Sequence, residues 1–344
     1  MADSRLKLLL KKTRPYQLLF VGVAVVCLLV FLVFNFSLND RAGAFDVRHA
    51  AQQVEVPVTR EGLTDLAIEA KNVKLEVGMV SSLTKPQVIL AGKGYNGERA
   101  KVDLEGTSCS IALEGSSHGD VRNLTMQVLL PQSDLTKVTI NGSNLNLHVE
   151  DLRTSFLRSS VGTIGNNSSY AYFSRVKADN MMVSGRDVPM RFYDNQVAAF
   201  AAESGNGSVT FLENDFERVD VGTREGDVFC YDTRFGGQWN LLSISGDITI
   251  LTKNLPYNMT VQAASDKVEL GYDKRYWKDA ERINIGGATI ATVGNNPDKI
   301  LKANTFGKIS IGQRERYSNL DPYAADYPFA DTNPYLIERS TITK

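Results

Sequence analysis

Glu225-Gly226-Asp227-Val228 and Ser245-Gly246-Asp247-Ile248 are two copies of one glycine-headed unit, about 20 residues apart, and they decide the expected fold. Another clear copy is Ser184-Gly185-Arg186-Asp187-Val188. Looser copies have their heads at Gly142, Gly205, Asp266 and Gly307. A period of this length, kept from the middle of the chain to near its end, is typical of stacked-repeat architectures.

Each head is followed by alternating apolar and polar residues, which is the period of a strand with one buried face. Val228 and Cys230 share the inward side of one copy, and Ile248 and Ile250 share that of the next. In other copies we expect the same inward column to continue through Met190, Phe211, Leu270 and Ile311. The alternating positions, which we expect to face solvent, are Asn146, Thr210, Thr249, Glu269 and Ser310.

A coil of ~20 residues holds two or three short strands of ~5 residues with turns between them. Stacked coils would then pair in parallel at a spacing of ~4.8 Å. We expect the head glycines to supply the positive φ that a tight corner demands. The sequence therefore predicts an all-β fold, a parallel β-solenoid in the form of a single-stranded β-helix.

One transmembrane helix is predicted to precede this solenoid, over residues 15–37. The run from Leu18 to Phe34 is apolar throughout, and with its flanks it is long enough to cross ~30 Å of hydrocarbon. Five Lys and Arg residues precede it against one acidic residue, Asp3, so we expect the N-terminus to be cytoplasmic. The alternatives are a signal peptide cleaved near Ala42-Gly43-Ala44, and a mitochondrial inner-membrane anchor with the solenoid in the intermembrane space.

The chain then divides into five parts. Residues 1–14 are a basic cytoplasmic tail, 15–37 the membrane helix, 38–58 a juxtamembrane linker, 59–312 the solenoid, and 313–344 an extended tail rich in proline, tyrosine and aspartate. The early strands of the solenoid lack the later period, and we expect them either to cap the stack against edge-to-edge pairing or to form irregular first coils. We expect the tail either to wrap the final coil or to serve as a tyrosine-bearing peptide for a partner, because proline removes ladder donors.

Composition excludes several classes of protein. The formal net charge of −1 over 344 residues gives no sign of a nucleic-acid partner, which would need a clustered basic face. Three cysteines do not make a disulfide framework. Cys109 and Cys230 fall on inward positions of alternating segments, so we expect both to be buried thiols.

Several segments, taken in order, resemble GIN-type adhesin domains. They are Leu63 to Val77, Val128-Leu129-Leu130-Pro131, Leu135 to Ser143, the Ser-Gly-Asp-Ile unit, and the closing stretch from Ile300 to Ile311. The resemblance covers roughly residues 60–312. It implies a repeat-built, non-catalytic domain outside the cytoplasm, often held by a membrane anchor, and it transfers no site residue.

Asp227 and Asp247 occupy equivalent positions of successive coils, and we place Asp187 on the same column. Carboxylates ~5 Å apart repel unless a cation or another group intervenes. A Ca²⁺ site is one interpretation, because Ca²⁺ takes carboxylate and backbone oxygens. The favoured interpretation is that these side chains bond local backbone amides at the corners. We therefore predict no cofactor.

An enzyme is the other class of hypothesis. A carbohydrate-cleaving β-helix needs paired carboxylates. The acids available for such a pair are Glu213, Asp215, Glu217, Asp220, Asp227 and Asp232. No GxSxG, P-loop or HExxH motif is present, and His49, His118 and His148 stand in no recognisable nucleophile setting. We therefore predict no catalytic residue.

Aromatic residues mark a candidate binding surface. By alternation Phe229 points outward, and a patch with Tyr231 and Trp239 could bind glycan or protein. The tail adds Tyr323, Tyr327 and Tyr335. Glycosylation sequons, which matter only on a eukaryotic secretory route, occur at Asn123, Asn141, Asn166, Asn167, Asn206 and Asn258.

These observations predict a non-catalytic module, held on a membrane by its N-terminal helix, that presents a β-solenoid outside the cytoplasm to a protein or glycan partner. The alternatives are a structural subunit of a larger membrane complex and a β-helical enzyme acting on glycans.

Overall fold

The computed structural model describes residues 52–55, 62–91, 99–114, 124–163, 169–252, 259–270 and 280–313. All of them belong to one compact unit, His49–Lys344. No helix in these ranges is long and apolar enough to cross a membrane. The predicted membrane helix, its basic leader and the C-terminal tail all lie outside the described residues.

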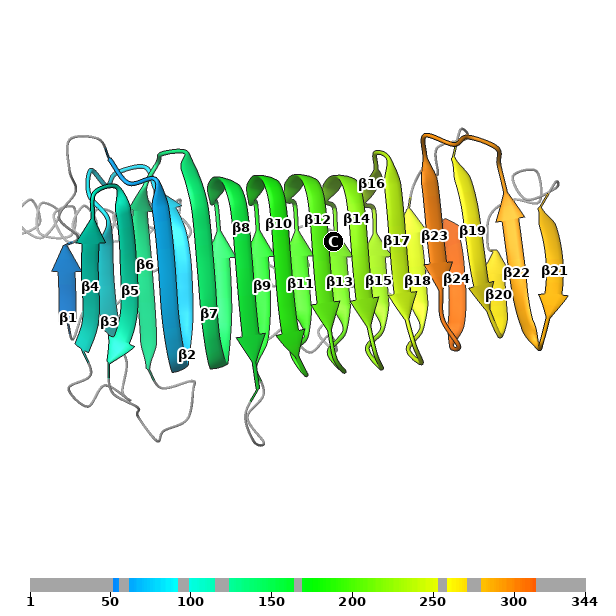
Figure 1. Cartoon of the computed structure of the whole chain (residues 1–344), viewed down its shortest axis with the longest axis horizontal. Helices are drawn as coiled ribbons and strands as arrows, with labels where there is room; N and C mark the ends of the chain where they lie inside the picture. The colour runs from blue at the N-terminus through cyan, green and yellow to red at the C-terminus, as the bar shows by residue number, and fades with distance from the viewer. Residues whose placement is uncertain are drawn as a thin grey trace, which may run out of the picture. The chain divides into compact units, whose positions relative to one another are not determined.

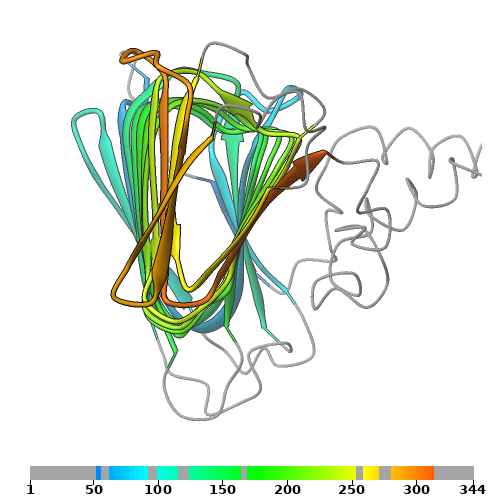
Figure 2. The same cartoon turned by 90° about the vertical axis from the view of Figure 1, so that its right-hand side faces the viewer.

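The prediction of an all-β fold is confirmed, because every element in the described ranges is a strand and most strands pair in parallel. The strands form a stack with two faces, the arrangement of a β-solenoid (Figure 1). Figure 2 looks along the stack and shows the two faces on opposite sides of an interior.

Each central coil gives one strand to each face. Face A contains β8 (Arg153–Gly162), β10 (Lys177–Arg186), β12 (Gln196–Ser204), β14 (Asp215–Thr223) with the short β16 (Arg234–Phe235), and β17 (Gln238–Ser243). Face B contains β9 (Tyr170–Ser174), β11 (Met190–Tyr193), β13 (Val209–Leu212), β15 (Val228–Tyr231) and β18 (Ile248–Thr252). Two long strands, β2 (Asp65–Val80) and β7 (Leu135–Glu150), run through both faces.

The C-terminal end of the stack departs from sequence order. The last coil in the sequence, β23 (Ile300–Asn304) with β24 (Lys308–Gln313), pairs between β17/β18 and the earlier coil β19 (Thr260–Ser265) with β20 (Lys267–Leu270). Antiparallel strands β22 (Ala288–Val293) and β21 (Glu281–Ile285) lie beyond β19. The last coil in the sequence is therefore not the last coil of the stack in space.

The N-terminal end of the stack also departs from sequence order. The coil β5 (Ser108–Glu114) with β6 (Thr125–Pro131) pairs on the outer side of β2, while β7, which follows it in sequence, pairs on the inner side. Antiparallel strands then cover the end: β4 (Arg99–Glu105), β3 (Gln87–Ala91) and β1 (Gln52–Glu55). This part agrees with the expectation that the early strands cap the stack.

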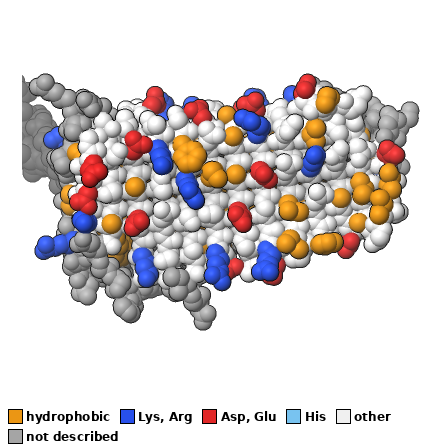
Figure 3. Space-filling model, in the orientation of Figure 1, with side chains coloured by type: hydrophobic (Ala, Val, Ile, Leu, Met, Phe, Trp, Pro, Cys, Tyr) orange, Lys and Arg blue, Asp and Glu red, His pale blue; other side chains and the backbone are white. Residues whose placement is uncertain are grey.

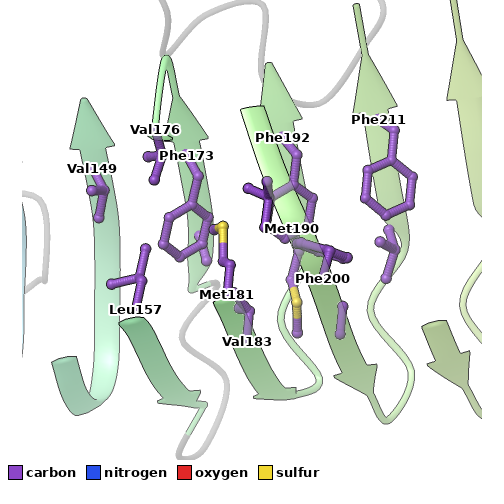
Figure 4. Packing of buried hydrophobic residues seen from close by; sticks show 14 of the residues in the cluster. Val149, Leu157, Phe173, Val176, Met181, Val183, Met190, Phe192, Phe200 and Phe211 are labelled. Atoms are coloured by element: carbon purple, nitrogen blue, oxygen red, sulfur yellow. The ribbon is translucent and has the colours of Figure 1, made fainter. Parts of the chain in front are cut away.

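The interior is a column of interdigitated apolar side chains (Figure 4). Phe173, Phe192 and Phe211 stack in adjacent coils with ring centroids 5.3 Å apart, and Phe200 packs edge-on against the last two. Cys230 continues the column, because it pairs with Phe211. The expected inward column misplaced Met190, which pairs with Val209, whereas Phe192 is the partner of Phe211.

Both cysteines are buried, as the sequence indicates, and neither is in a disulfide. Burial raises the pKa of the Cys109 thiol to about 11 and raises the pKa of the Cys230 thiol as well. A bridge between these two residues is therefore absent from the described stack.

Glycine is required at the repeat heads for a reason other than the expected one. Among the described glycines, positive φ is confined to Gly62, Gly106, Gly286, Gly287 and Gly294, none of which is a repeat head. A Cβ on Gly226 would instead overlap the Gly207 carbonyl of the preceding coil. A Cβ on Gly246 would overlap the Gly226 carbonyl in the same way. Close approach of backbone between coils, not left-handed geometry, excludes a side chain at these corners.

Left-handed backbone occurs at Asn72, Asn144 and Asp187 near the glycine corners, but it recurs regularly at the other corner, where face B ends. Asp151, Arg175, Asp194, Glu213 and Asp232 have φ between 46° and 55°, one residue in each successive coil. Such values are uncommon for residues other than glycine, asparagine and aspartate. This second corner therefore repeats as regularly as the glycine corner, without a glycine to mark it.

Asparagine holds the second corner together from inside. Asn195 and Asn214 are buried, and the Asn195 backbone N–H and Nδ2 both donate to Asn214 Oδ1, at 3.0 and 2.9 Å. Asn195 Oδ1 accepts in turn from the backbone N–H of Val176, at 2.8 Å. Buried backbone groups at a turn need such partners, and this ladder supplies them.

Candidate binding surface

Face A is the open face of the stack. Its outward side chains include many charged ones, seen in blue and red in Figure 3. Arg158, Asp220 and Lys302 are exposed examples on face-A strands. Apolar side chains gather toward the C-terminal end of the same face in Figure 3, over β17 to β22. The exposed large ones in this part of the chain are Leu242, Ile244, Ile283, Ile285 and Phe306.

A shallow groove of about 760 Å³ crosses the coils where face A turns toward face B. Its floor is made of small residues at the ends of successive face-A strands, because serine and glycine recur there. The residues that form this groove are Gly142, Ser160, Val161, Gly162, Ser184, Gly185, Arg186, Glu203, Ser204, Gly205, Gly222, Thr223, Arg224, Leu242 and Ile244.

Two glycines of the floor are not required by the packing of the stack. A Cβ on Gly222 would meet no atom within 4 Å, and a Cβ on Gly162 would meet only the Gly142 carbonyl oxygen, at 4.0 Å. Neither has positive φ. The absence of a side chain at Gly222 therefore keeps the groove open without serving the fold, in contrast with Gly226 a few residues later.

The walls carry charge at one side and apolar surface at the other. Arg186 and Arg224 are exposed cations, with Glu203 as an exposed carboxylate between their coils. Leu242 and Ile244, both 49% exposed, form an apolar lip. Phe306, 72% exposed, extends that lip, because its backbone N–H donates to the Ile244 carbonyl at 3.1 Å. An extended chain with acidic and apolar groups matches this combination.

A second polar cluster lies on the outer side of face B. Glu150 is 1% exposed, and it contacts the guanidinium of Arg175, which also donates to both carboxylate oxygens of Asp151 at 2.7 and 2.9 Å. Burial raises the pKa of Glu150 to about 7 against the opposing effect of Arg175. Burial also lowers the pKa of His148, whose Nε2 lies 3.5 Å from Glu150 Oε2, to about 4.

Neighbouring coils extend this cluster. The amide of Gln127 donates to Glu76 Oε2 at 2.7 Å, and Lys74 Nζ lies 2.7 Å from Glu76 Oε1. Buried charge of this kind is tolerated because each carboxylate has a cationic or hydrogen-bonding partner. The cluster is held tightly by its own partners, so it does not offer an open catalytic pair.

Two of the three predicted column aspartates are brought together. Asp247 backbone N–H donates to Asp227 Oδ1 at 2.8 Å, and Lys308 backbone N–H donates to Asp247 Oδ1 at 2.8 Å. Asp187 is not on this column, because the register that pairs Met190 with Val209 and Val209 with Val228 aligns Asp227 with Pro189. No group of three or more His, Cys, Asp or Glu side chains in the described ranges could hold a metal ion.

The predicted aromatic surface is only partly at the surface. Phe229 points outward from face B and stacks on Tyr231, with ring centroids 6.3 Å apart. Tyr231 is 4% exposed, however, and Trp239 is buried in the interior against Phe235. Trp239 therefore cannot be part of a binding surface, and its predicted place there is wrong. Tyr323, Tyr327 and Tyr335 lie outside the described residues.

Of the candidate glycosylation sites, Asn206 is exposed at a turn and Asn141 is half-buried in β7. Asn123, Asn166, Asn167 and Asn258 lie outside the described residues.

The groove on face A was not predicted from the sequence. The signal in the sequence that could have indicated the groove is the recurrence of serine and glycine near the ends of the face-A strands. These residues were instead interpreted as corners of the coils.

The two-faced stack of parallel coils, capped by antiparallel strands, defines a repeat-built all-β domain. The sequence matches the Toastrack DUF4097 family over residues 52–292, and the chain belongs to that family. No curated protein matches it.

Solved structures of low sequence identity are also similar to this chain. A putative adhesin from Parabacteroides merdae ATCC 43184 is 11% identical with a TM-score of 0.41, over 76% of this chain and 94% of that one. A putative adhesin from Parabacteroides distasonis ATCC 8503 is 13% identical with a TM-score of 0.40, over 76% and 96%. A putative cell adhesion protein from Clostridium sporogenes ATCC 15579 is 10% identical with a TM-score of 0.20, over 76% and 99%.

Proposed function

We propose that this chain is a non-catalytic binding module, and that the face-A groove is its ligand-binding surface. One observation supports this most: Gly222 leaves the groove open at a position where the fold has room for a side chain. Stacked coils make a rigid platform, because each strand is paired on both sides through the central part of the stack. A rigid site loses little entropy when it binds.

The ligand that fits best is an extended, acidic segment of a partner protein with an apolar residue. Arg186 and Arg224 supply planar donors for carboxylates, and Leu242 with Ile244 supplies an apolar contact. Among the residues that form the groove, Glu203 is the one carboxylate. Two carboxylates are needed for glycoside hydrolysis, so an enzyme acting on glycans is the weaker alternative.

The test uses the full chain in mild detergent, probed with arrays of acidic peptides and of glycans. Gly222→Leu fills the groove and should abolish binding, while Asn240→Leu, an exposed position of β17 outside the groove, should leave it unchanged. If the chain captures a glycan and Gly222→Leu blocks that capture, the ligand of the groove is a glycan and not an acidic peptide. Equal binding by both variants would refute the groove as the site. Constant co-purification with one set of membrane proteins, unaffected by Gly222→Leu, would favour a structural subunit.

We further propose that residues 15–37 anchor the chain in a membrane and that the stack lies outside the cytoplasm. The apolar length of that segment and the basic residues before it support this placement. Asn206→Cys, at an exposed turn, should react with a membrane-impermeant maleimide on intact cells, whereas Thr13→Cys should not. The opposite pattern would reverse the topology, and labelling only in isolated mitochondria would point to the intermembrane space.

A further inference from the structure

The sheet of face A ends in two edge strands of different character. It begins with β4, runs through β5, β2 and β7 to the central coils, and then continues through β17, β23, β19 and β22 to β21. Among the described strands, β4 pairs with β5 alone and β21 with β22 alone. Each edge therefore presents a row of backbone N–H and C=O groups to which a further strand can add.

The N-terminal edge is protected by charge. Arg99, Lys101, Asp103 and Glu105 occupy alternate, exposed positions of β4, and the residues between them are half-buried. Lys101 Nζ lies 3.3 Å from Asp103 Oδ2, so the two form an ion pair on this edge. Charged side chains on an edge strand disfavour pairing with another chain.

The C-terminal edge, β21, lacks this protection. All of its residues, Glu281–Ile285, are exposed. Ile283 and Ile285 are 46% and 61% exposed on the same side of the strand, and Ile283 pairs with Ile290 of β22. We call these three isoleucines the edge patch, which lies within the apolar surface at the C-terminal end of face A (Figure 3). An exposed apolar edge strand is a template for pairing with another strand.

The exposure of β21 distinguishes it from the outer side of face B. On face B, Asn146, Thr210 and Ser310 are buried, although the alternation of their segments predicted that they face solvent. That prediction is wrong for these three residues. Face A is therefore the open face of the stack, and β21 is its unprotected end.

We propose that a second copy of this chain occupies the edge patch, by antiparallel pairing of β21 with the same strand of the partner about a two-fold axis. The register that pairs the whole strand places Ile283 opposite the partner's Ile283 and Arg282 opposite the partner's Asn284. Apolar side chains then meet at the centre and no like charges are opposed, which favours an antiparallel pair. A register centred on Arg282 would instead oppose two guanidinium groups.

Closure of the assembly argues for a second copy in this arrangement. A two-fold contact uses the unprotected edge of both copies, so the joined sheet ends in two charged β4 strands and extends no further. A head-to-tail contact of β21 with β4 of the next copy would leave an open edge at every step and would form a fibre. The charges of β4 oppose that contact. The chemistry of the two edges therefore matches a closed dimer.

The dimer gives face A two binding sites. The two-fold axis is perpendicular to the sheet, because this register keeps the outer sides of both copies on one face. Both face-A grooves then open on the same side, and linked sites bind a partner with two epitopes more tightly than one site does. The contact itself does not rest on the function proposed for the groove.

The first test compares two substitutions that start from equal exposure. Ile283→Lys opposes like charges at the centre of the contact, whereas Met182→Lys changes a residue of β10, also 46% exposed, in a central coil of face A. Two differently tagged copies of the full chain are co-expressed, extracted in mild detergent and isolated through one tag. Recovery of the other tag should fall about tenfold with Ile283→Lys and stay unchanged with Met182→Lys. Equal recovery in both variants, or none with the unaltered chain, would overturn the proposal.

Cross-linking tests the arrangement without a charged substitution. In a Cys27→Ser chain, Ile283→Cys places two thiols on Cβ atoms ~5 Å apart, so a short bismaleimide should link the copies. A link between Ile283→Cys and Lys101→Cys copies would overturn the two-fold contact in favour of a head-to-tail assembly. The absence of any link would also overturn it, and protection of the Ile283→Cys thiol from a soluble maleimide in native membranes would then assign the edge to a different protein. Because groove binding is measured separately, failure here leaves the Gly222→Leu experiment unaffected.

Discussion

Asn195 and Asn214 occupy the same corner of adjacent coils, and Asn195 donates to Asn214 Oδ1 through both its backbone N–H and its side-chain Nδ2. Asn214 Nδ2 donates in turn to the Phe192 carbonyl at 2.9 Å. One side chain therefore serves three groups of a buried turn. Its removal would take these hydrogen bonds from the Asn195 backbone N–H and the Phe192 carbonyl, while Asn195 Nδ2 would keep its bond to the Phe173 carbonyl at 3.1 Å.

We expect Asn214→Ala to lower the free energy of unfolding by about 2 to 4 kcal/mol, because each buried group left without a partner costs ~1–3 kcal/mol. Denaturant unfolding followed by circular dichroism measures the change. Asn240→Ala, at an exposed position of β17, is the matched control and should change stability by less than about 0.5 kcal/mol. A loss below 1 kcal/mol for Asn214→Ala would mean that water replaces the side chain at this corner.

Two glycines four residues apart should respond in opposite ways to the same substitution. Gly226→Ala places a Cβ against the Gly207 carbonyl and should cost about 2 kcal/mol or more, as overpacking does. Gly222→Ala meets nothing and should stabilise the stack by ~0.5–1 kcal/mol, since glycine weakens a strand. Thermal unfolding of both variants checks this. Equal melting temperatures would show that the coils can separate enough to admit a Cβ.

Glu150 should make stability fall as the pH rises. Its pKa in the folded chain, about 7, lies above its ordinary value of 4.5, so the folded state binds the proton more tightly than the unfolded state. This contribution is fully present below about pH 4.5 and is lost as the pH rises through 7. At ~1.4 kcal/mol per pKa unit, the loss is on the order of 3 to 4 kcal/mol.

The comparison with Glu150→Gln isolates this effect, because glutamine keeps the neutral form at every pH. His148 acts in the opposite direction: its folded pKa of about 4 lies below 6.5, so its contribution is lost as the pH falls through that window. Both chains share His148, and its effect cancels in the difference. Wild-type stability minus that of Glu150→Gln should decrease from pH 5 to pH 8. A difference independent of pH would mean that Arg175 keeps Glu150 ionised throughout.

Cys109 and Cys230 should be inert in the folded chain. Both are buried, and burial raises the pKa of each thiol, so little thiolate is available to react. In a Cys27→Ser chain at pH 8, Ellman's reagent should detect about two thiols only after unfolding in guanidinium. Rapid reaction of one thiol before unfolding would show that its coil opens locally.

The sequence predicted the central coils well because each carries the same local signals, a corner glycine and a strand of period two. The register between neighbouring coils was harder to predict. Asp187 and Val188 lie two residues out of step with Asp227 and Val228, and this moved Met190 and Asp187 onto the wrong columns. Nothing local marks such an offset, because it is fixed by pairing with the neighbouring coil.

The ends and the candidate site were less predictable for a similar reason. The strands β23 and β24 look like a last repeat, and only their pairing with β17 and β18 shows that they are inserted. Trp239 alternates with Gln238 and Asn240 as a buried strand position does, but the prediction grouped it with Phe229 in an aromatic patch. The groove at Gly222 is a gap between side chains of six coils, and no single segment encodes it.

The inserted coils at both ends bear on how such a chain can change in length. A repeat added between β8 and β17 only lengthens a run of like coils, each of which pairs with the coil before and after it. A repeat added beyond β18 would separate β19 and β20 from the β23–β24 pair that joins them to the stack. We therefore expect duplication or deletion of a coil to be tolerated in the middle of the stack and to be disruptive at the two ends, where coils pair out of sequence order. Relatives should differ in the number of central coils while keeping the pairing of coils at both ends.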